Sequence, residues 1–256
     1  MFMSTISGSG PGVVLVHGVG VGPESFAATA AALGATGRRV HRVLRPGYGE
    51  HADGGQHAMD RSVGIDEQVD LIIGSINRHE IEPVVWVGVS GGATLGLIAA
   101  VRRPVPISCV LLHEPLVGPA AAPLHEAIQT AAARLEDGPS DTTARRARAV
   151  DYLIGLVGAE CWATLGPDGQ AAAKRRADLI RLEVPGFASF EAPAAPPDDS
   201  VRVVITVGER SPGIRHDSAA IAAELLGGEV LVVPGVGHLP QVQAPEVYAE
   251  IIGAYS

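Results

Sequence analysis

Short apolar runs alternate with amphipathic segments along the first half of the chain. Continuous runs of Val, Ile and Leu are typical of strands buried on both faces of a parallel sheet. Segments whose apolar residues recur every three or four positions, as in residues 60–79, predict helices packed against such a sheet. The pattern predicts strands at 13–16, 39–44, 84–89 and 107–112 and helices at 23–33, 60–79 and 91–101. This alternation indicates parallel βαβ units and therefore the α/β fold class.

The alternation stops near residue 119. Residues 119–192 predict helices only, at 123–135, 142–156, 159–165 and 170–182. A Pro-rich linker follows at 193–200, and strands at 201–207 and 229–233 with helices at 217–226 and 245–254 resume the alternation. We therefore predict one α/β core, residues 1–118 and 193–256, interrupted between two strands by a helical cap, residues 119–192. Such an insertion usually covers the carboxyl edge of the sheet, where ligands bind.

The composition narrows the function classes. The 256 residues are 46% hydrophobic and 18% charged, which predicts a folded rather than a disordered chain. The formal net charge is −9 and the sequence has no Lys- and Arg-rich stripe, so we expect no nucleic-acid partner. Cys109 and Cys161 lie far apart in the sequence and predict buried free thiols rather than a disulfide or a metal site.

One uncharged run has the length of a membrane span. The glycines and the serine within residues 84–101 predict a strand, a turn and a helix instead of one membrane helix. The first four residues lack the positive charge that opens a signal peptide, and residues 4–12 are rich in Ser and Gly and predict a loose segment. We therefore expect a cytoplasmic protein with no membrane partner.

The sharpest motif is Gly88-Val89-Ser90-Gly91-Gly92, which follows an apolar run and precedes a helix rich in small residues. A G-x-S-x-G motif in that context is a tight strand-to-helix turn that presents a serine hydroxyl above the sheet. Small neighbours are needed because the turn is strained and the backbones pass closely. We predict Ser90 as a nucleophile; the alternative is a serine that only shapes the turn.

A serine nucleophile needs a base and donors for the oxyanion. His238 lies directly after the last predicted strand, and the order serine then histidine suits this class of fold. For the oxyanion hole we predict the backbone N–H of Gly91 and that of Val19, with Gly18 as the second choice in the same loop. His17 is expected to be structural. Six other histidines fall on predicted surface or loop segments and are expected to be solvated: His41, His51, His57, His79, His125 and His216.

A strand that ends in His-Gly, the G-x-S-x-G turn and a late Gly-x-Gly-His segment together resemble the α/β-hydrolase fold over nearly the whole chain. The resemblance implies a mostly parallel sheet with helices on both faces, a cap domain and a Ser–His–acid triad. In many members the acid follows the strand after the cap, where this chain has Ser211. The other known location follows the preceding strand, so we assign Glu114 as the acid. Glu209 and then Asp217 are the alternative acids, and the alternative for Glu114 is a salt bridge to an arginine of the cap.

A narrower resemblance rests on His-Glu-Pro at 113–115, Ala-Glu-Cys-Trp-Ala at 159–163 and Pro-Gly-Val-Gly-His at 234–238. These segments are similar to the fungal zearalenone lactonases and their bacterial relatives, which implies a Ser–His–Glu triad with the Glu before the cap and a cap tryptophan over the bound macrolide. The matching stretch here has no aromatic residue, and Ile180 lies nearest that position. Ile180, Trp162 and Phe187 are therefore the candidate substrate-binding residues, with core packing as the alternative for the aromatic pair, and zearalenone is not the expected substrate.

These features together predict a serine hydrolase without metal or organic cofactor. Its partner would be a small-molecule ester or lactone, apolar and uncharged, cleaved through an acyl-enzyme. C–C bond hydrolases and cofactor-free lyases use the same scaffold and triad, and a non-catalytic ligand sensor can retain it, so these alternatives stay open. A homodimer is left open as well.

Overall fold

The computed structural model describes residues 5–7, 9–49, 62–79, 84–102, 106–136, 141–193 and 196–256. Its described strands form one seven-stranded sheet in the order β1-β3-β2-β4-β5-β6-β7, in which only β1 is antiparallel to its neighbour. The strands are β1 (Thr5–Ser7), β2 (Gly12–Val16), β3 (Arg39–Arg42), β4 (Val84–Val89), β5 (Ile107–His113), β6 (Arg202–Gly208) and β7 (Glu229–Val233). The six parallel strands carry all their carboxyl ends to the same edge.

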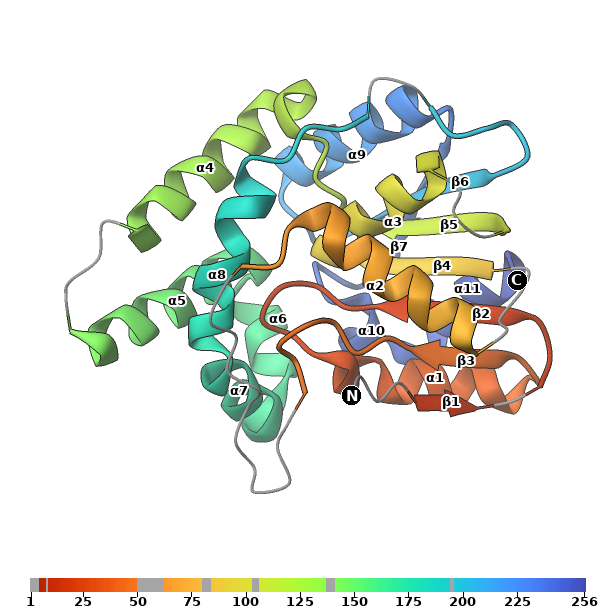
Figure 1. The fold of residues 1–256 in the computed structure, drawn as a ribbon, viewed down its shortest axis with the longest axis horizontal. Helices are drawn as coiled ribbons and strands as arrows, with labels where there is room; N and C mark the ends of the chain where they lie inside the picture. The colour runs from red at the N-terminus through yellow and green to blue at the C-terminus, as the bar shows by residue number, and fades with distance from the viewer. Residues whose placement is uncertain are drawn as a thin grey trace.

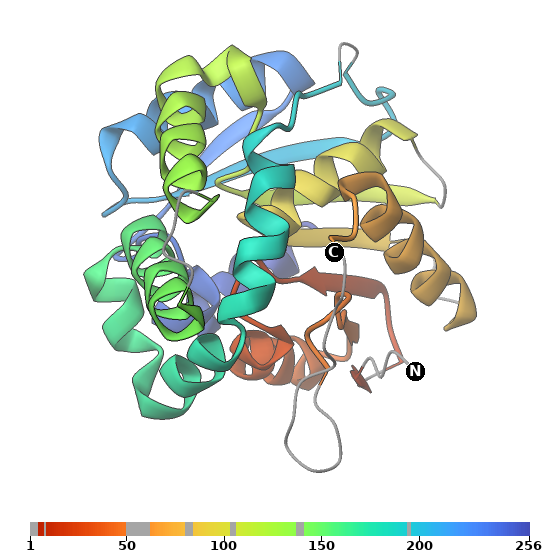
Figure 2. The ribbon, with the colours of Figure 1, turned by 60° about the vertical axis from the view of Figure 1, so that its left-hand side comes forward.

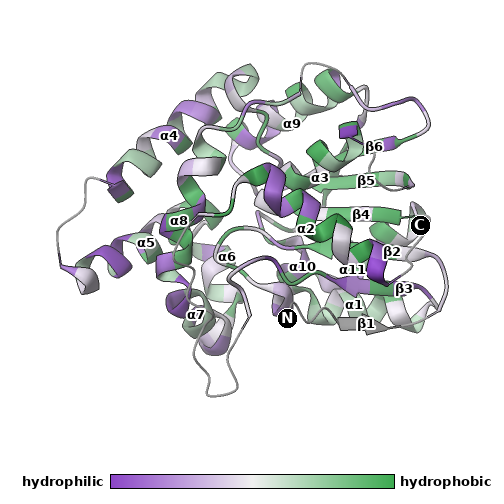
Figure 3. Cartoon of the chain, viewed as in Figure 1, coloured by the Kyte–Doolittle hydropathy of each residue, from purple (hydrophilic) through white to green (hydrophobic). Residues whose placement is uncertain are grey.

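The central strands are valine-rich and every residue of β2 and β4 is buried, as expected for a sheet covered on both faces. In Figure 3 strands β4 and β5 are green over most of their length. Helices α1 (Ala27–Ala35) and α11 (Pro245–Ala254) pack together on one face, and α2 (Ile65–Arg78) and α3 (Gly91–Arg102) on the other (Figure 1). The chain moves from β2 outward to β3 and returns on the other side as β4, so the carboxyl ends of β2 and β4 flank the switch point where ligands of such sheets bind.

Most of the described chain between β5 and β6 is helical. It begins with a 3-10 turn, Gly118–Ala121, and continues as α4 (Ala122–Glu136), α5 (Thr142–Val157), α6 (Ala159–Thr164), α7 (Gly166–Arg175) and α8 (Ala177–Ala188). These helices, called the helical insertion below, lie beyond the carboxyl edge of the sheet (Figure 1). In Figures 1 and 2 alike, α8 stands between the other insertion helices and the sheet, and it contacts both α4 and α5.

Three expectations need correction. The helix predicted at 170–182 is two helices, because the chain leaves helical geometry at Arg176 (φ −87°, ψ 11°), whose buried guanidinium forms an ion pair with Glu24. Part of the N-terminal segment expected to be loose is strand β1, paired with β3. His41, expected to be solvated, is fully buried beside the Ser75 hydroxyl; His51 and His57 lie outside the described residues.

The remaining helices close the fold on either side of β7. They are α9 (Gly213–Leu226), between β6 and β7, and the short α10 (Pro240–Gln243), which leads into α11. None of the described helices is long and apolar enough to cross a membrane. Cys109 and Cys161 are both buried and unbridged, as predicted.

Candidate active site

Ser90 occupies a strained turn between β4 and α3. Its φ of 55° lies in the left-handed region, which a residue with a side chain adopts only where the surroundings impose it. A Cβ at Gly88 would lie 2.3 Å from the Gly92 carbonyl oxygen, and one at Gly92 would lie 2.1 Å from that of Val16. Only glycine fits at both positions, because the helix starts directly against the neighbouring strand. The turn therefore has the strand–turn–helix geometry of a nucleophile elbow.

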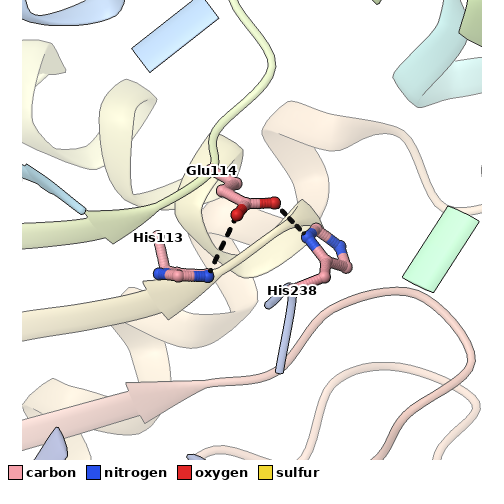
Figure 4. Close-up of side chains that lie close together, drawn as sticks. All are labelled: His113, Glu114 and His238. Atoms are coloured by element: carbon pink, nitrogen blue, oxygen red, sulfur yellow. Dashed lines mark hydrogen bonds and ion pairs between the residues drawn. The ribbon is translucent and has the colours of Figure 1, made fainter. Parts of the chain in front are cut away.

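His238 and Glu114 form a short hydrogen bond at the same edge of the sheet. Nδ1 of His238, in the loop after β7, lies 2.5 Å from Oε2 of Glu114, which directly follows β5 (Figure 4). Both side chains are almost completely buried. Because Nδ1–H donates to the carboxylate, Nε2 is left as the acceptor nitrogen, and it has no hydrogen-bond partner among the described residues. A histidine in this state is ready to take a proton.

The carboxylate of Glu114 is surrounded by donors. Ser211, at the position where many α/β-hydrolases carry the acid, donates its hydroxyl to Oε1 at 2.5 Å, and Gly208 N–H donates to the same oxygen at 3.2 Å. Nε of Arg215, on α9, lies 3.2 Å from Oε2. Burial by itself would raise the pKa of Glu114, but the opposing effect of His238 and Arg215, among others, holds that pKa well below its usual range.

The competing acids lie elsewhere. Glu209 is exposed, and its carboxylate accepts the N–H of Gly235 at 2.7 Å. Asp217 is exposed on α9. The alternative role for Glu114 is a salt bridge to an arginine of the cap. Glu114 does form an ion pair with an arginine, but this residue is Arg215 on α9 of the core. The hydrogen bond from His238 to Glu114 forms beside that ion pair. Of the three sequence candidates, Glu114 is the carboxylate that contacts His238.

His113 joins this cluster and was given no role from the sequence. Its Nε2 lies 3.5 Å from Oε1 of Glu114 (Figure 4) and 3.3 Å from the Gly237 carbonyl oxygen, while Nδ1 lies 3.0 Å from the Thr206 hydroxyl. Burial lowers the pKa of His113 to about 4, so the ring is neutral at neutral pH. Ligand atoms of His113, Glu114 and His238 come within 4.8 Å of one another, as metal ligands do, but both carboxylate oxygens are already bonded to donors and an arginine cation is adjacent. The donor set fits a hydrogen-bonded triad acid better than a cation ligand.

The candidate oxyanion donors lie close to Ser90. A Cβ at Gly18 would lie 3.1 Å from Cβ of Ser90, which places the loop after β2 against the nucleophile turn. The backbone N–H groups of Val19 and Gly91 make no hydrogen bond within the described residues. Gly91 N–H is also the first of α3, where the helix dipole favours negative charge. Two free N–H groups at one edge can bind a developing oxyanion.

A cavity of about 670 Å³ adjoins His238, whereas Ser90 and Glu114 are not among the residues that line it. Ser211, Arg215 and His238 line it on the core side. Apolar side chains of α4, α5 and α9 line it as well: Leu124, Ile128, Leu135, Leu156 and Ile214. The other charged side chains that line it are exposed: Arg134, Arg148, Asp151, Glu160 and Arg210. The volume suits a small organic molecule, and the charged side chains other than Arg215 lie toward solvent.

The predicted substrate-binding residues lie outside this cavity. Ile180 is fully buried on α8, 3.1 Å from where a Cβ of Gly20 would stand, and Phe187 lies 3.0 Å from the equivalent point on Gly91. Ile180 is therefore beside the loop after β2, and Phe187 is beside the start of α3. Trp162 is half-buried on α6 and packs against the core. The sequence offered no signal for the cavity, because its walls combine residues from α4, α5, α6 and α9.

The sequence matches the model of the alpha/beta hydrolase family over residues 13–251. The chain belongs to the alpha/beta hydrolase family. Comparison with curated proteins gives no match. Among solved structures, this alpha/beta hydrolase superposes on a thermophilic esterase from Thermogutta terrifontis with a TM-score of 0.75, at 19% identity, covering 99% of this chain and 92% of that chain.

Two further solved structures have the same fold. A bromoperoxidase from Bacillus anthracis gives a TM-score of 0.71 at 17% identity, covering 99% of this alpha/beta hydrolase and 94% of that chain. An enol-lactonase from Burkholderia xenovorans LB400 gives 0.63 at 16% identity, covering 99% and 95%. At these identities the likeness establishes the fold, and the reaction has to be argued from the site.

Proposed function

We propose that this chain is a serine hydrolase that cleaves an apolar, uncharged carboxylic ester, a lactone among them, through an acyl-enzyme. One observation carries the proposal: Glu114 fixes His238 by Nδ1 and leaves its buried Nε2 as a free acceptor, at the sheet edge that holds the strained Ser90. A serine hydroxyl is a weak nucleophile, and a base oriented in this way is what activates it.

In the proposed reaction Ser90 Oγ attacks the ester carbonyl while Nε2 of His238 takes its proton. The N–H groups of Gly91 and Val19 stabilise the oxyanion, and the imidazolium then gives its proton to the leaving alkoxide. In the second half a water molecule attacks the acyl-enzyme with His238 again as base. Glu114 stays ionised throughout, since its pKa is held low, and stabilises the imidazolium.

The cavity supports an apolar substrate. Its lining includes the buried aliphatic side chains of Leu124, Ile128, Leu135 and Val157 beside Cys161, Ser211 and His238. Its charged residues, apart from Arg215 bound to Glu114, face solvent. The helical insertion, which supplies most of the cavity wall, acts in this proposal as the cap over a core of residues 1–118 and 193–256. A Ser–His–Glu triad whose Glu precedes the cap resembles the zearalenone lactonases, and the solved structures that share the fold include proteins described as an esterase and an enol-lactonase. The stretch around Ile180 has no aromatic residue, so we propose an ester other than zearalenone.

A substrate series tests this proposal. With p-nitrophenyl esters of growing acyl chain and lactones with alkyl tails, kcat/KM is expected to rise by about fourfold per methylene until the cavity is filled. Ala131→Phe, which fills the cavity from α4, should lower kcat/KM for the longer members and spare the acetate ester; Ala133→Phe, exposed on the same helix, is the matched control. Absence of turnover across the series would contradict the hydrolase and favour a ligand sensor or C–C bond chemistry.

Arg215 is expected to set the acid limb of the pH profile. Burial lowers the pKa of His238 below its usual value of 6.5, Arg215 lowers it further, and Glu114 opposes both. Because the base must be neutral, activity should persist below the usual pKa and fall as the pH drops through the lowered one. Arg215→Gln removes the cation, so the acid limb of kcat/KM should move up by about one pH unit.

The matched control for this profile is Arg215→Lys, which keeps the charge. We expect its acid limb to stay close to that of the parent chain, whatever the change in kcat. Equal acid limbs for the parent, Arg215→Gln and Arg215→Lys would show that Arg215 does not tune His238. The measurement is kcat/KM for one ester between about pH 4.5 and 9, with circular dichroism at each pH to exclude unfolding.

A further inference from the structure

A buried polar cluster connects the helical insertion to the loop after β2. Arg45, Tyr48, Gln68 and Glu183 are each at most 5% exposed, and Glu183 comes from α8 whereas the others belong to the core. Nη2 of Arg45 lies 2.5 Å from one oxygen of Glu183, and the Tyr48 hydroxyl donates to the other at 2.6 Å. Burying such a pair is costly unless every partner is satisfied, and such clusters are poor sources of net stability. Net stability therefore does not explain why these four side chains are buried together.

The cluster holds the peptide groups on both sides of Val19. Nη1 of Arg45 donates to the carbonyl oxygens of His17, at 3.2 Å, and Gly18, at 3.0 Å. The Tyr48 oxygen accepts the N–H of Gly20 at 2.8 Å. The hydroxyl proton of Tyr48 is directed to Glu183, so its lone pair is available to Gly20.

These contacts determine where the Val19 N–H points. In a planar trans peptide the carbonyl of one residue and the N–H of the next point in opposite directions. Binding the Gly18 carbonyl to Arg45 therefore turns the Val19 N–H to the side away from Arg45, and the bond from Gly20 fixes the following peptide. Gly20 adopts a φ of 74°, which lets the chain turn immediately after Val19.

We propose that Glu183 is a positioning residue for the oxyanion hole, acting through Arg45 and Tyr48 on the Val19 peptide. This inference rests on the hydrolase proposed above. It makes the insertion part of the catalytic apparatus: α8 supplies the carboxylate that orients both groups on the core. Preorganised donors stabilise the transition state more than the bound ester, so their loss should appear in kcat rather than KM.

The test uses two substitutions in the full chain. Tyr48→Phe removes the acceptor of the Gly20 N–H with almost no change in shape, and Glu183→Gln removes the charge that orients Arg45 and Tyr48. For both, kcat should fall by about 10-fold to 100-fold with KM within about twofold of the parent. The affinity of an alkyl boronic acid, whose adduct with serine is a tetrahedral anion, should fall in parallel. Asp178→Asn is the matched control, because Asp178 lies on the same helix in an exposed ion pair with Arg146.

The outcomes separate this inference from the proposed function. If the parent chain neither turns over esters nor reacts at Ser90 with a fluorophosphonate, the hydrolase proposal itself has failed. If the parent reacts but Tyr48→Phe and Glu183→Gln keep its kcat and boronate affinity, the hydrolase stands and the positioning role is overturned. Loss of the circular dichroism spectrum in both variants, or an effect on KM alone, would likewise make the cluster structural. If Glu183→Gln unfolds and Tyr48→Phe does not, the kcat and boronate affinity of Tyr48→Phe decide whether the cluster positions the Val19 peptide.

Discussion

Ser90→Ala is expected to lower kcat/KM for p-nitrophenyl esters by at least about 10⁴-fold, since the proposed acyl-enzyme forms on the Ser90 hydroxyl. The fold should survive, because the substitution removes one hydroxyl from a half-buried position and leaves the turn glycines in place. The left-handed backbone of Ser90 is strain that the turn maintains whatever the side chain. Ser90→Ala should therefore lower kcat/KM and leave the melting temperature close to that of the parent.

The mass of the intact protein after incubation with a fluorophosphonate tests directly whether Ser90 is the nucleophile. The parent should gain one adduct, located on Ser90 by peptide mapping, and Ser90→Ala should gain none. Ser189→Ala is the matched control, because Ser189 is an exposed serine at the end of α8 and should leave both labelling and turnover unchanged. Turnover retained by Ser90→Ala, or an adduct on another residue, would remove Ser90 from the mechanism.

Strong local patterns made much of the fold predictable. Strands β4 and β7 and helix α11 have the predicted bounds, because a proline marks one boundary of each: Pro83 before β4, Pro234 after β7 and Pro245 at the start of α11. The break between α7 and α8 was not predictable, since the segment around Arg176 keeps a helical composition and the ion pair to Glu24 joins positions far apart in sequence. Tertiary contacts of this kind decide helix ends where propensity alone is neutral.

The candidate site was also predictable only in part. The resemblance to the α/β-hydrolases gave two known positions for the acid, and the serine at position 211 pointed to the other one, Glu114, because a neutral hydroxyl cannot stabilise an imidazolium. The sequence could not predict that Ser211 would donate to Glu114, or that Arg215 would lie against the same carboxylate. Nor could it predict the Arg45–Glu183 pair, which spans 138 positions and depends on how α8 lies across the sheet edge.

Glu114→Gln should lower kcat by about 10³-fold to 10⁴-fold. A glutamine amide offers Nδ1 of His238 no negative charge, and when its N–H₂ faces the ring it donates to Nδ1 and moves the imidazole proton to Nε2. In that tautomer His238 cannot accept the proton of Ser90. The change is measured as kcat at the pH optimum, with Glu209→Gln as the matched control. Glu209 is exposed and its carboxylate accepts the N–H of Gly235, so the kcat of Glu209→Gln should stay within about twofold of the parent.

The same variant has a second signature in stability. The pKa of Glu114 is lowered in the folded chain, so its carboxylate stabilises the fold above its unfolded pKa and loses this contribution as the pH falls through the lowered value. Glu114→Gln should therefore lower the free energy of unfolding at neutral pH, where Arg215 is left buried without its partner, and reduce its fall with acid. The experiment is urea unfolding between about pH 3 and 7, in which the gap between parent and variant should narrow toward acid. If Glu209→Gln loses kcat while Glu114→Gln keeps it, the acid is Glu209 and not Glu114.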